Sequence, residues 1–206
     1  MIVGKRMTRE PVTVGPDELL SAAAHKMQSG GFRRLPVVSD GKLIGIITDR
    51  DVRGHRGHLE HTKIKAAISE SPLIITPETT LEEAAVIMLE QQIGGLPVVH
   101  DRRLVGVITT SDIMRAFLGV MGASQGGSTR IDFVLEGEEH GFIEATRIVA
   151  REGGEILGVG TFRDTVGENP VCYLRLTASN PDQVAKALRS SGYNVLGVHR
   201  IGGEIA

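Results

Sequence analysis

The chain has 206 residues, of which 41% are hydrophobic, and this is enough apolar material for one large or two modest folded domains. Lysine and arginine number 23 against 25 aspartate and glutamate, so the formal net charge is -2, and this balance argues against nucleic acid or a membrane surface as a partner. The sequence shows no apolar run of signal-peptide or membrane-span length, so we expect a cytoplasmic protein.

An internal duplication organises the first half of the chain. Residues 11–51, shifted by 61 positions, lie on residues 72–112 without a gap and with 16 identities in 41 positions. The identities include the run Leu35-Pro36-Val37-Val38 and the frame Gly-x-x-Thr-x-x-Asp that ends each copy. The duplication therefore predicts that one structural unit occurs twice.

Each copy predicts a strand, a helix, two strands and a second helix. Apolar residues spaced i, i+3, i+4 and i+7 mark one helix face, from Leu20 in the first copy and from Leu81 in the second. Thr76-Pro77-Glu78 combines a capping residue, a proline and an acid, which predicts that the helix of the second copy begins there. Two β-branched runs flank Ser39-Asp40-Gly41-Lys42 and predict a hairpin.

The second half of the chain predicts a different module. Residues 119–128 are rich in glycine and other small residues, which is typical of a linker. Beyond it the pattern predicts strand, helix, strand, strand, helix and strand over residues 130–135, 142–151, 155–162, 171–177, 181–190 and 195–201. This order is the ferredoxin-like arrangement. Cys172 lies in the third of these strands, where we expect a buried small hydrophobic residue.

The repeated Thr-x-x-Asp frame is the strongest candidate for chemistry. Thr48 and Asp51 in one copy, and Thr109 and Asp112 in the other, end a strand and open a helix. A hydroxyl, free backbone N–H groups and a carboxylate meet there, and these groups suit a phosphate and a ribose diol. The alternative is that each pair merely caps its helix. Preservation of the frame in both copies favours a ligand.

With these motifs, the first 118 residues resemble a tandem pair of cystathionine-β-synthase-type (CBS) domains, with repeats over residues 1–60 and 61–118. The resemblance implies clefts for an adenine nucleotide such as AMP, ADP or ATP, or for a related adenosyl ligand. Asp51 and Asp112 would contact the ribose, and Thr48 and Thr109 would lie beside it. Arg33 and Arg34 stand where family members often hold phosphates, and Gly94 and Gly95 replace them in the second copy. We expect the Thr48/Asp51 cleft to carry these arginines, although a solvated surface pair is the alternative.

Residues 129–206 resemble an ACT domain, a module that often binds amino acids between domains. The loop after its first strand would form the effector site, and His140 and Gly141 stand there, so either effector binding or a dimerising role is open. Two CBS repeats followed by an ACT domain resemble the acetoin-utilisation B-type proteins, and the combined fold class is α/β (α+β).

These observations predict a regulator rather than an enzyme, without catalytic residues, a catalytic cofactor or a metal site. The histidines of the stretch 55–61 are interpreted as part of a connector, because Gly54 and Gly57 disfavour a helix that would hold a metal. We expect a homodimer that binds a small-molecule effector and passes the signal to a regulated protein partner. Two alternatives remain open: a scaffold with empty clefts, and an enzyme that processes nucleotides.

Overall fold

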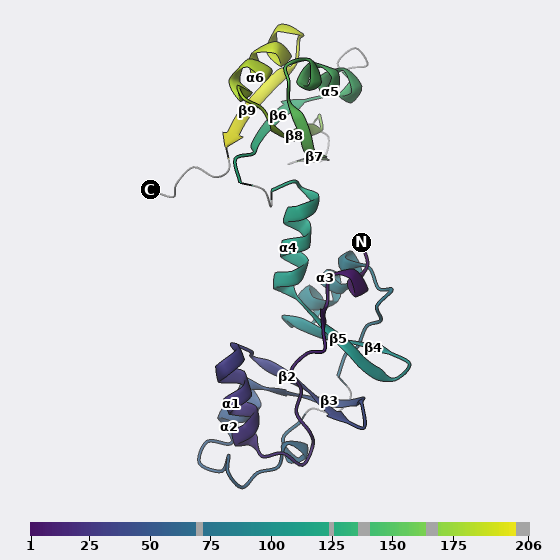
Figure 1. Cartoon of the computed structure of the whole chain (residues 1–206), viewed down its shortest axis with the longest axis vertical. Helices are drawn as coiled ribbons and strands as arrows, with labels where there is room; N and C mark the ends of the chain where they lie inside the picture. The colour runs from purple at the N-terminus through teal and green to yellow at the C-terminus, as the bar shows by residue number, and fades with distance from the viewer. Residues whose placement is uncertain (69–71, 124–125, 136–140, 164–168, 201–206) are drawn as a thin grey trace. The chain divides into compact units, whose positions relative to one another are not determined.

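The computed structural model describes residues 1–68, 72–123, 126–135, 141–163 and 169–200 (Figure 1). Contacts divide the chain into two compact units, Met1–Ile113 and Met114–Ala206, and the boundary falls inside one helix, α4 (Thr110–Val120). Within the described residues, the first unit has a five-stranded sheet and the second a four-stranded sheet. Among the described helices, none combines the length and the apolar character that crossing a membrane requires.

The two repeats form the first unit. Its elements are the 3-10 helix η1 (Val3–Lys5), β1 (Thr8–Arg9), α1 (Leu20–Gly30), β2 (Arg34–Ser39), β3 (Lys42–Thr48), α2 (Asp49–Gly54), η2 (Ile64–Ala66), α3 (Leu81–Glu90), β4 (Gly95–His100) and β5 (Arg103–Thr109). The elements of the two repeats correspond along the chain apart from β1, whose equivalent residues 69–70 lie outside the described ranges. The hairpins β2–β3 and β4–β5 have the same register, with a bulge after Val37 in one and after Val98 in the other. The predicted duplication and both hairpins are therefore confirmed.

The tight turns of the two hairpins differ in one residue that matters for stability. Asp40 and Gly41 both have positive φ angles in the first hairpin, of 51° and 78°, and Asp101 and Arg102 have φ angles of 48° and 63° in the second. Two consecutive residues of this kind match the right-handed twist of the flanking strands. Glycine adopts this conformation without strain, whereas arginine does not.

The predicted start of α3 at Thr76 is wrong, because the helix begins four to five residues later. Thr80 is its N-cap and accepts a hydrogen bond from the N–H of Glu83, while the Glu83 carboxylate accepts one from the N–H of Thr80 at 3.0 Å. The hydrogen bond from the Thr80 N–H lowers the pKa of the Glu83 carboxyl. Such a capping box satisfies two orphan donors at once and outcompetes the single cap that Thr76 offers.

The two repeats exchange the short segments that precede them. The N–H of Val3 donates to the carbonyl of Thr79 at 2.8 Å, and Val3 is fully buried although it opens the first repeat. Ile64 makes the equivalent contact, since its N–H donates to the carbonyl of Glu18 at 2.9 Å. A boundary between residues 60 and 61 therefore separates the two repeats in sequence but not in space, because the segment that precedes each repeat packs on the other repeat. In the first repeat, Ile64 joins the buried core of α1, β2 and β3.

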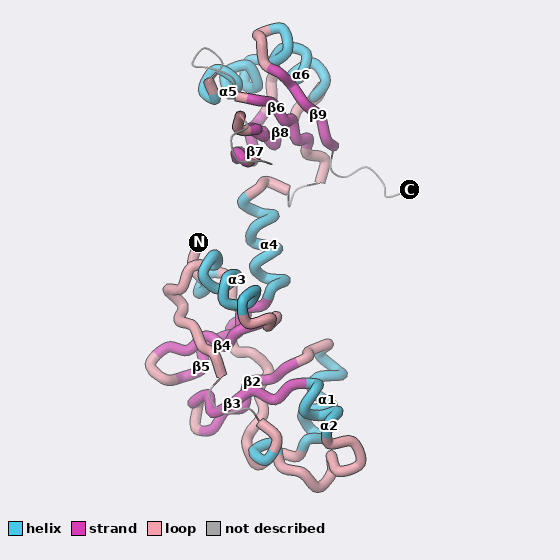
Figure 2. Tube along the Cα trace, turned by 180° about the vertical axis from the view of Figure 1, so that it is seen from behind, coloured by secondary structure: helices cyan, strands magenta, loops and turns pink. Residues whose placement is uncertain are grey.

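The second unit has the predicted ferredoxin-like topology. Its elements are β6 (Thr129–Val134), α5 (Phe142–Arg151), β7 (Glu155–Phe162), β8 (Val171–Thr177), α6 (Pro181–Ser190) and β9 (Asn194–Arg200). The strands pair antiparallel in the order β7-β8-β6-β9. Both helices cover one face of the sheet (Figure 2). The core between them includes Phe133, Leu174 and Cys172, and burial raises the pKa of the Cys172 thiol to about 11.

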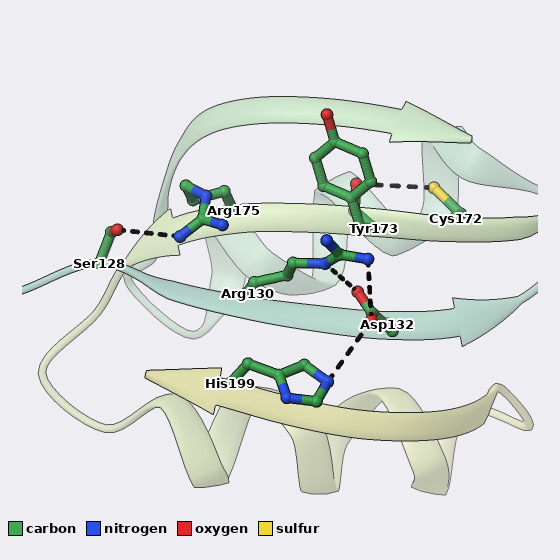
Figure 3. Close-up of polar contacts among 7 residues, drawn as sticks. All are labelled: Ser128, Arg130, Asp132, Cys172, Tyr173, Arg175 and His199. Atoms are coloured by element: carbon green, nitrogen blue, oxygen red, sulfur yellow. Dashed lines mark hydrogen bonds and ion pairs between the residues drawn. The ribbon is translucent and has the colours of Figure 1, made fainter. Parts of the chain in front are cut away.

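The other face of this sheet carries a polar cluster (Figure 3). Arg130 forms a bidentate ion pair with Asp132, at 2.6 and 3.0 Å, and its guanidinium lies 4.7 Å from the centre of the Tyr173 ring. Nε2 of His199 lies 3.5 Å from the same carboxylate. Arg175, which is buried, donates to the hydroxyl of Ser128 at 3.3 Å.

Part of the predicted linker over residues 119–128 is packed rather than free. Helix α4 extends to Val120, and the next two residues lie against β7. A Cβ on Gly122 would stand 2.8 Å from the carbonyl oxygen of Leu157, and one on Gly158 would stand 2.7 Å from that of Met121. Two glycines thus allow a backbone-to-backbone approach that no larger residue permits.

Candidate functional site

The Thr-x-x-Asp frame of the first repeat forms a capping box at the start of α2. Oδ2 of Asp51 accepts hydrogen bonds from the N–H of Thr48 at 2.9 Å and from its hydroxyl at 2.6 Å. The N–H of Asp51 donates to the same hydroxyl oxygen at 3.3 Å. The bonds to Oδ2 hold the carboxylate at the helix N-terminus, where the dipole of the helix favours a negative charge.

The second repeat reproduces this geometry at the start of α4. Oδ2 of Asp112 accepts from the N–H and the hydroxyl of Thr109, again at 2.9 and 2.6 Å. The capping interpretation of both pairs is therefore correct as far as it goes. It leaves open what the preserved frame binds, since a capped carboxylate can still accept hydrogen bonds from a ligand.

Arg33 and Arg34 lie at the start of the first hairpin, where the two repeats meet. Arg34 is the first residue of β2 and pairs with Thr48, while the carbonyl of Arg33 accepts the N–H of Asp49 at 2.9 Å. The side chain of Arg34 is directed elsewhere, because its Nη1 donates to the carbonyl of Gly95 in the second repeat at 3.4 Å. Arg33 is exposed and Arg34 is partly buried.

A cavity of about 680 Å³ lies between the repeats and contains both arginines. Its polar lining comes from Thr8, Glu10, Arg33, Arg34, Gln92, Thr109, Thr110 and Ser111, and its apolar lining includes Val12, Phe32, Pro36, Ile46, Pro97 and Val107. Apolar walls with a few polar groups are typical of a small-molecule site, and this volume lies within the usual range for one. Apolar residues suit a flat apolar group, and arginine side chains suit an anion.

The cavity groups the predicted site residues differently from the sequence. We expected Arg33 and Arg34 to share a cleft with Thr48 and Asp51, but the cavity that holds these arginines is lined by Thr109 of the second repeat. Thr48, Asp51 and Asp112 do not line the cavity. Asp112 accepts a hydrogen bond from the hydroxyl of Thr109, and Thr109 lines the cavity. The arginines and the threonine come together because each repeat faces the other, which neighbours in sequence cannot reveal.

The glycines that replace the arginines in the second copy are structurally distinct from each other. A Cβ on Gly94 would meet nothing within 4 Å, so a side chain fits there. A Cβ on Gly95 would stand 3.2 Å from the carbonyl oxygen of Ile108, which leaves little room. The second repeat thus has room for a larger residue at position 94 but has a glycine there.

The predicted effector loop of the second unit is only partly described. His140 lies outside the described residues. Gly141 is the N-cap of α5, and its carbonyl accepts a hydrogen bond from the Tyr193 hydroxyl at 2.9 Å.

Comparison with known proteins identifies the first unit. The family model described as the CBS domain matches residues 3–57 and 64–119, which together make up more than half of the chain. Among curated relatives, the uncharacterized protein MJ1225 of Methanocaldococcus jannaschii is 30% identical over 131 residues. The match covers 56% of this chain and 47% of the relative, so the chain spans about half of that protein's length.

Solved structures match the same part of the chain. A putative acetoin utilization protein (AcuB) from Vibrio cholerae is 32% identical with a TM-score of 0.54, over 57% of this chain and 90% of that one. CBSX2 in complex with AMP is 29% identical with a TM-score of 0.53, over 57% and 96%. The CBS domain pair of MJ0100, in complex with 5'-methylthioadenosine and S-adenosyl-L-methionine, is 29% identical with a TM-score of 0.52, over 58% and 97%.

Proposed function

Because the chain belongs to the family of proteins with tandem CBS domains, we propose that it is a regulator whose paired repeats bind an adenosyl ligand. The observation that carries this proposal is the cavity between the repeats, whose lining includes two arginines and four residues with hydroxyl groups among apolar residues. Two structural relatives hold ligands with an adenosine moiety, AMP in one and 5'-methylthioadenosine with S-adenosyl-L-methionine in the other. The cavity offers the walls for adenine and the donors for a phosphate or a ribose.

Ligand binding would act on the arrangement of the repeats. The cavity has walls from both repeats, so a ligand that fills it stabilises one spacing of the two hairpins over others. The ribose contact would come from the Asp112 carboxylate, held beside Thr109 at the start of α4. Since α4 continues to Val120, a shift at its first turn is passed along a continuous helix.

We further propose that the second unit is an ACT-type module, and that the protein works as a homodimer which passes the signal to a protein partner. Its strand order supports the ferredoxin-like part of this assignment. Assembly is supported by α4, whose side chains Met114, Phe117 and Val120 are each more than half exposed. Exposed apolar residues on one helix mark an interaction surface. A scaffold that only assembles through this helix is the second candidate function.

Thermal unfolding with a panel of ligands tests the proposal. Adenosine, AMP, ADP, ATP, S-adenosylmethionine and 5'-methylthioadenosine are each added at increasing concentration to the full chain. A ligand at about one hundred times its Kd should stabilise the protein by about 2.7 kcal/mol and raise the melting temperature by several degrees. GMP and inosine serve as control ligands. No shift with any adenosyl compound, together with an intact dimer, would leave the scaffold as the function.

A further inference from the structure

A buried arginine lies on the face of the second unit's sheet that the helices leave open. Arg175, on β8, is 3% exposed, and its Nη1 donates to the hydroxyl of Ser128 at 3.3 Å (Figure 3). Its Nε is buried and has no hydrogen-bond partner. Asp132 on the neighbouring strand accepts two hydrogen bonds from Arg130, and among the described residues no carboxylate forms an ion pair with Arg175.

The burial of this charge costs free energy. A buried cation without an anion loses hydration that one neutral hydroxyl does not replace. The alternation of side chains along β8 places Cys172, Leu174 and Leu176 in the apolar core and Arg175 on the other face. A methionine at that position would have a similar length and no charge to bury. The orphaned Nε therefore points to an anion that the described part of the chain does not itself supply.

The groups around the guanidinium suit one carboxylate. Nε and a terminal nitrogen of an arginine form a fork that matches the two oxygens of a carboxylate. The hydroxyl of Ser128, which is 1% exposed, lies beside Nη1 and adds a further donor. One arginine balances the single charge of a carboxylate. A phosphate carries more than one charge at neutral pH and would be repelled more strongly by Asp132 on the neighbouring strand.

The neighbours of Arg175 disfavour an amino group on the ligand. Arg130 is its direct partner in the pairing of β6 with β8, so a second positive charge already stands beside the site. Asp132 is engaged with Arg130 through both of its oxygens, and Glu155, the first residue of β7, is exposed to water. The ammonium of an amino acid would thus approach two arginines without gaining a buried carboxylate of its own.

We propose that the second unit binds a small organic acid without an amino group through Arg175 and Ser128. This site goes beyond the adenosyl ligand of the first unit and does not depend on it. It lies on the face of the sheet opposite the two helices, whereas Gly141, in the loop where an effector was expected, caps α5 (Figure 2). Since both residues of the site are buried, entry of the acid involves the backbone of Met121, which lies against Gly158, the neighbour of Arg175 on β7.

Hydrogen exchange of the full chain in propionate and in alanine tests the proposal, because alanine is propionate with an added ammonium group. Each is added at increasing concentration and constant ionic strength, with chloride as the balancing anion. Propionate at about ten times its Kd should slow exchange in β6 and β8 about tenfold where exchange requires opening of the sheet, while alanine and inorganic phosphate should have little effect. Equal protection by alanine would overturn the exclusion of amino acids. Equal protection by phosphate would show a general anion effect and overturn the carboxylate site.

Variants of Arg175 separate a ligand site from a structural role. Arg175→Met removes the charge at a similar length, so the protection by propionate should disappear while the stability without propionate is kept or raised. Arg189→Met, on an exposed face of α6, is the matched control and should keep the full response. If Arg175→Met does not fold, Arg175→Lys decides, because it keeps the charge but loses the fork and should need roughly tenfold more propionate for the same protection. A wild type that does not respond to propionate, or a response that is unchanged in these variants of Arg175, would refute the proposal.

Discussion

Arg34 donates a hydrogen bond to the carbonyl of Gly95, and these two residues occupy the same position in the two repeats. The contact lies where the two halves of the first unit face each other, so only one of the two copies can supply the side chain. A side chain at Gly95 has little room as well, because its Cβ would stand 3.2 Å from the carbonyl oxygen of Ile108. The asymmetry between the copies is therefore a property of the packing as well as of the ligand.

Exchanging the left-handed residues of the two hairpin turns tests the strain at Arg102. Arg102→Gly should raise the free energy of unfolding by up to about 1 kcal/mol, because glycine adopts a φ of 63° without a Cβ penalty. Gly41→Ala, at the equivalent position of the other repeat, should lower it by about 1 kcal/mol or more. Urea unfolding of the three proteins measures both effects, and a destabilised Arg102→Gly would show that the arginine side chain makes a stronger contribution elsewhere.

The close approach of Met121 and Gly122 to β7 predicts a sensitive glycine. Gly158→Ala adds a Cβ that would stand 2.7 Å from backbone atoms of Met121, and we expect a loss of about 1–3 kcal/mol in stability of the second unit. Gly119→Ala is the matched control, because a Cβ there meets nothing within 4 Å and alanine favours helix α4 by up to about 1 kcal/mol. Hydrogen exchange of β7 should rise in the first variant and stay unchanged in the second.

The exposed face of α4 predicts the dimer contact. Met114 and Phe117, which are 59% and 58% exposed, stand where the first repeat has Arg53 and Arg56. We expect Met114→Glu with Phe117→Glu to give a monomer in light scattering at micromolar concentration, while Arg53→Glu with Arg56→Glu leaves the dimer intact. The second repeat has apolar residues where the first has charged ones, and this difference argues for association through α4 of the second repeat. A dimer that survives the first pair would place the interface elsewhere.

The raised pKa of Cys172 predicts both low reactivity and a limit on alkaline stability. Burial favours the neutral thiol and raises its pKa to about 11, and the charge of Asp132 acts in the same direction. Because this folded-state pKa lies above the value of an exposed thiol, the stabilisation is complete below about pH 9 and is lost as the pH rises towards 11. A thiol reagent at pH 8 should react at least about tenfold more slowly with folded protein than with protein in guanidinium. Equal rates would mean that the thiol is accessible.

Local sequence patterns predict most of the fold. The hairpins follow from β-branched runs around Asp40-Gly41, and the six elements of the second unit from their periodicity, because each signal lies within a few neighbouring residues. The start of α3 was missed because two capping signals compete within five residues, and the choice between Thr76 and Thr80 depends on the reciprocal bond from Glu83. Sequence alone ranks such signals poorly.

The grouping of the candidate site residues differs between the sequence and the structure. Arg34 and Thr109 line one cavity and Asp112 does not, whereas the sequence pattern pairs Arg34 with the Thr48/Asp51 frame that follows it in the same repeat. The side chain crosses instead to the second repeat, as its bond to Gly95 shows. Whether Arg34 lies near the frame of its own repeat or that of the other repeat depends on how the two repeats pack. The sequence does not decide between these two arrangements, because the spacing of residues within each repeat is the same in both.

The exchanged leading segments affect how this protein can be synthesised and divided. The residues around Val3 are synthesised before the second repeat, but their partner Thr79 exists only after the second repeat has been made, so their burial follows the closure of the first repeat on Ile64. A protein cut between residues 60 and 61 would give two fragments, each without the segment that completes its core. When the two fragments are mixed, each should supply the segment that completes the core of the other and the fold should form, whereas either fragment alone should stay partly unfolded.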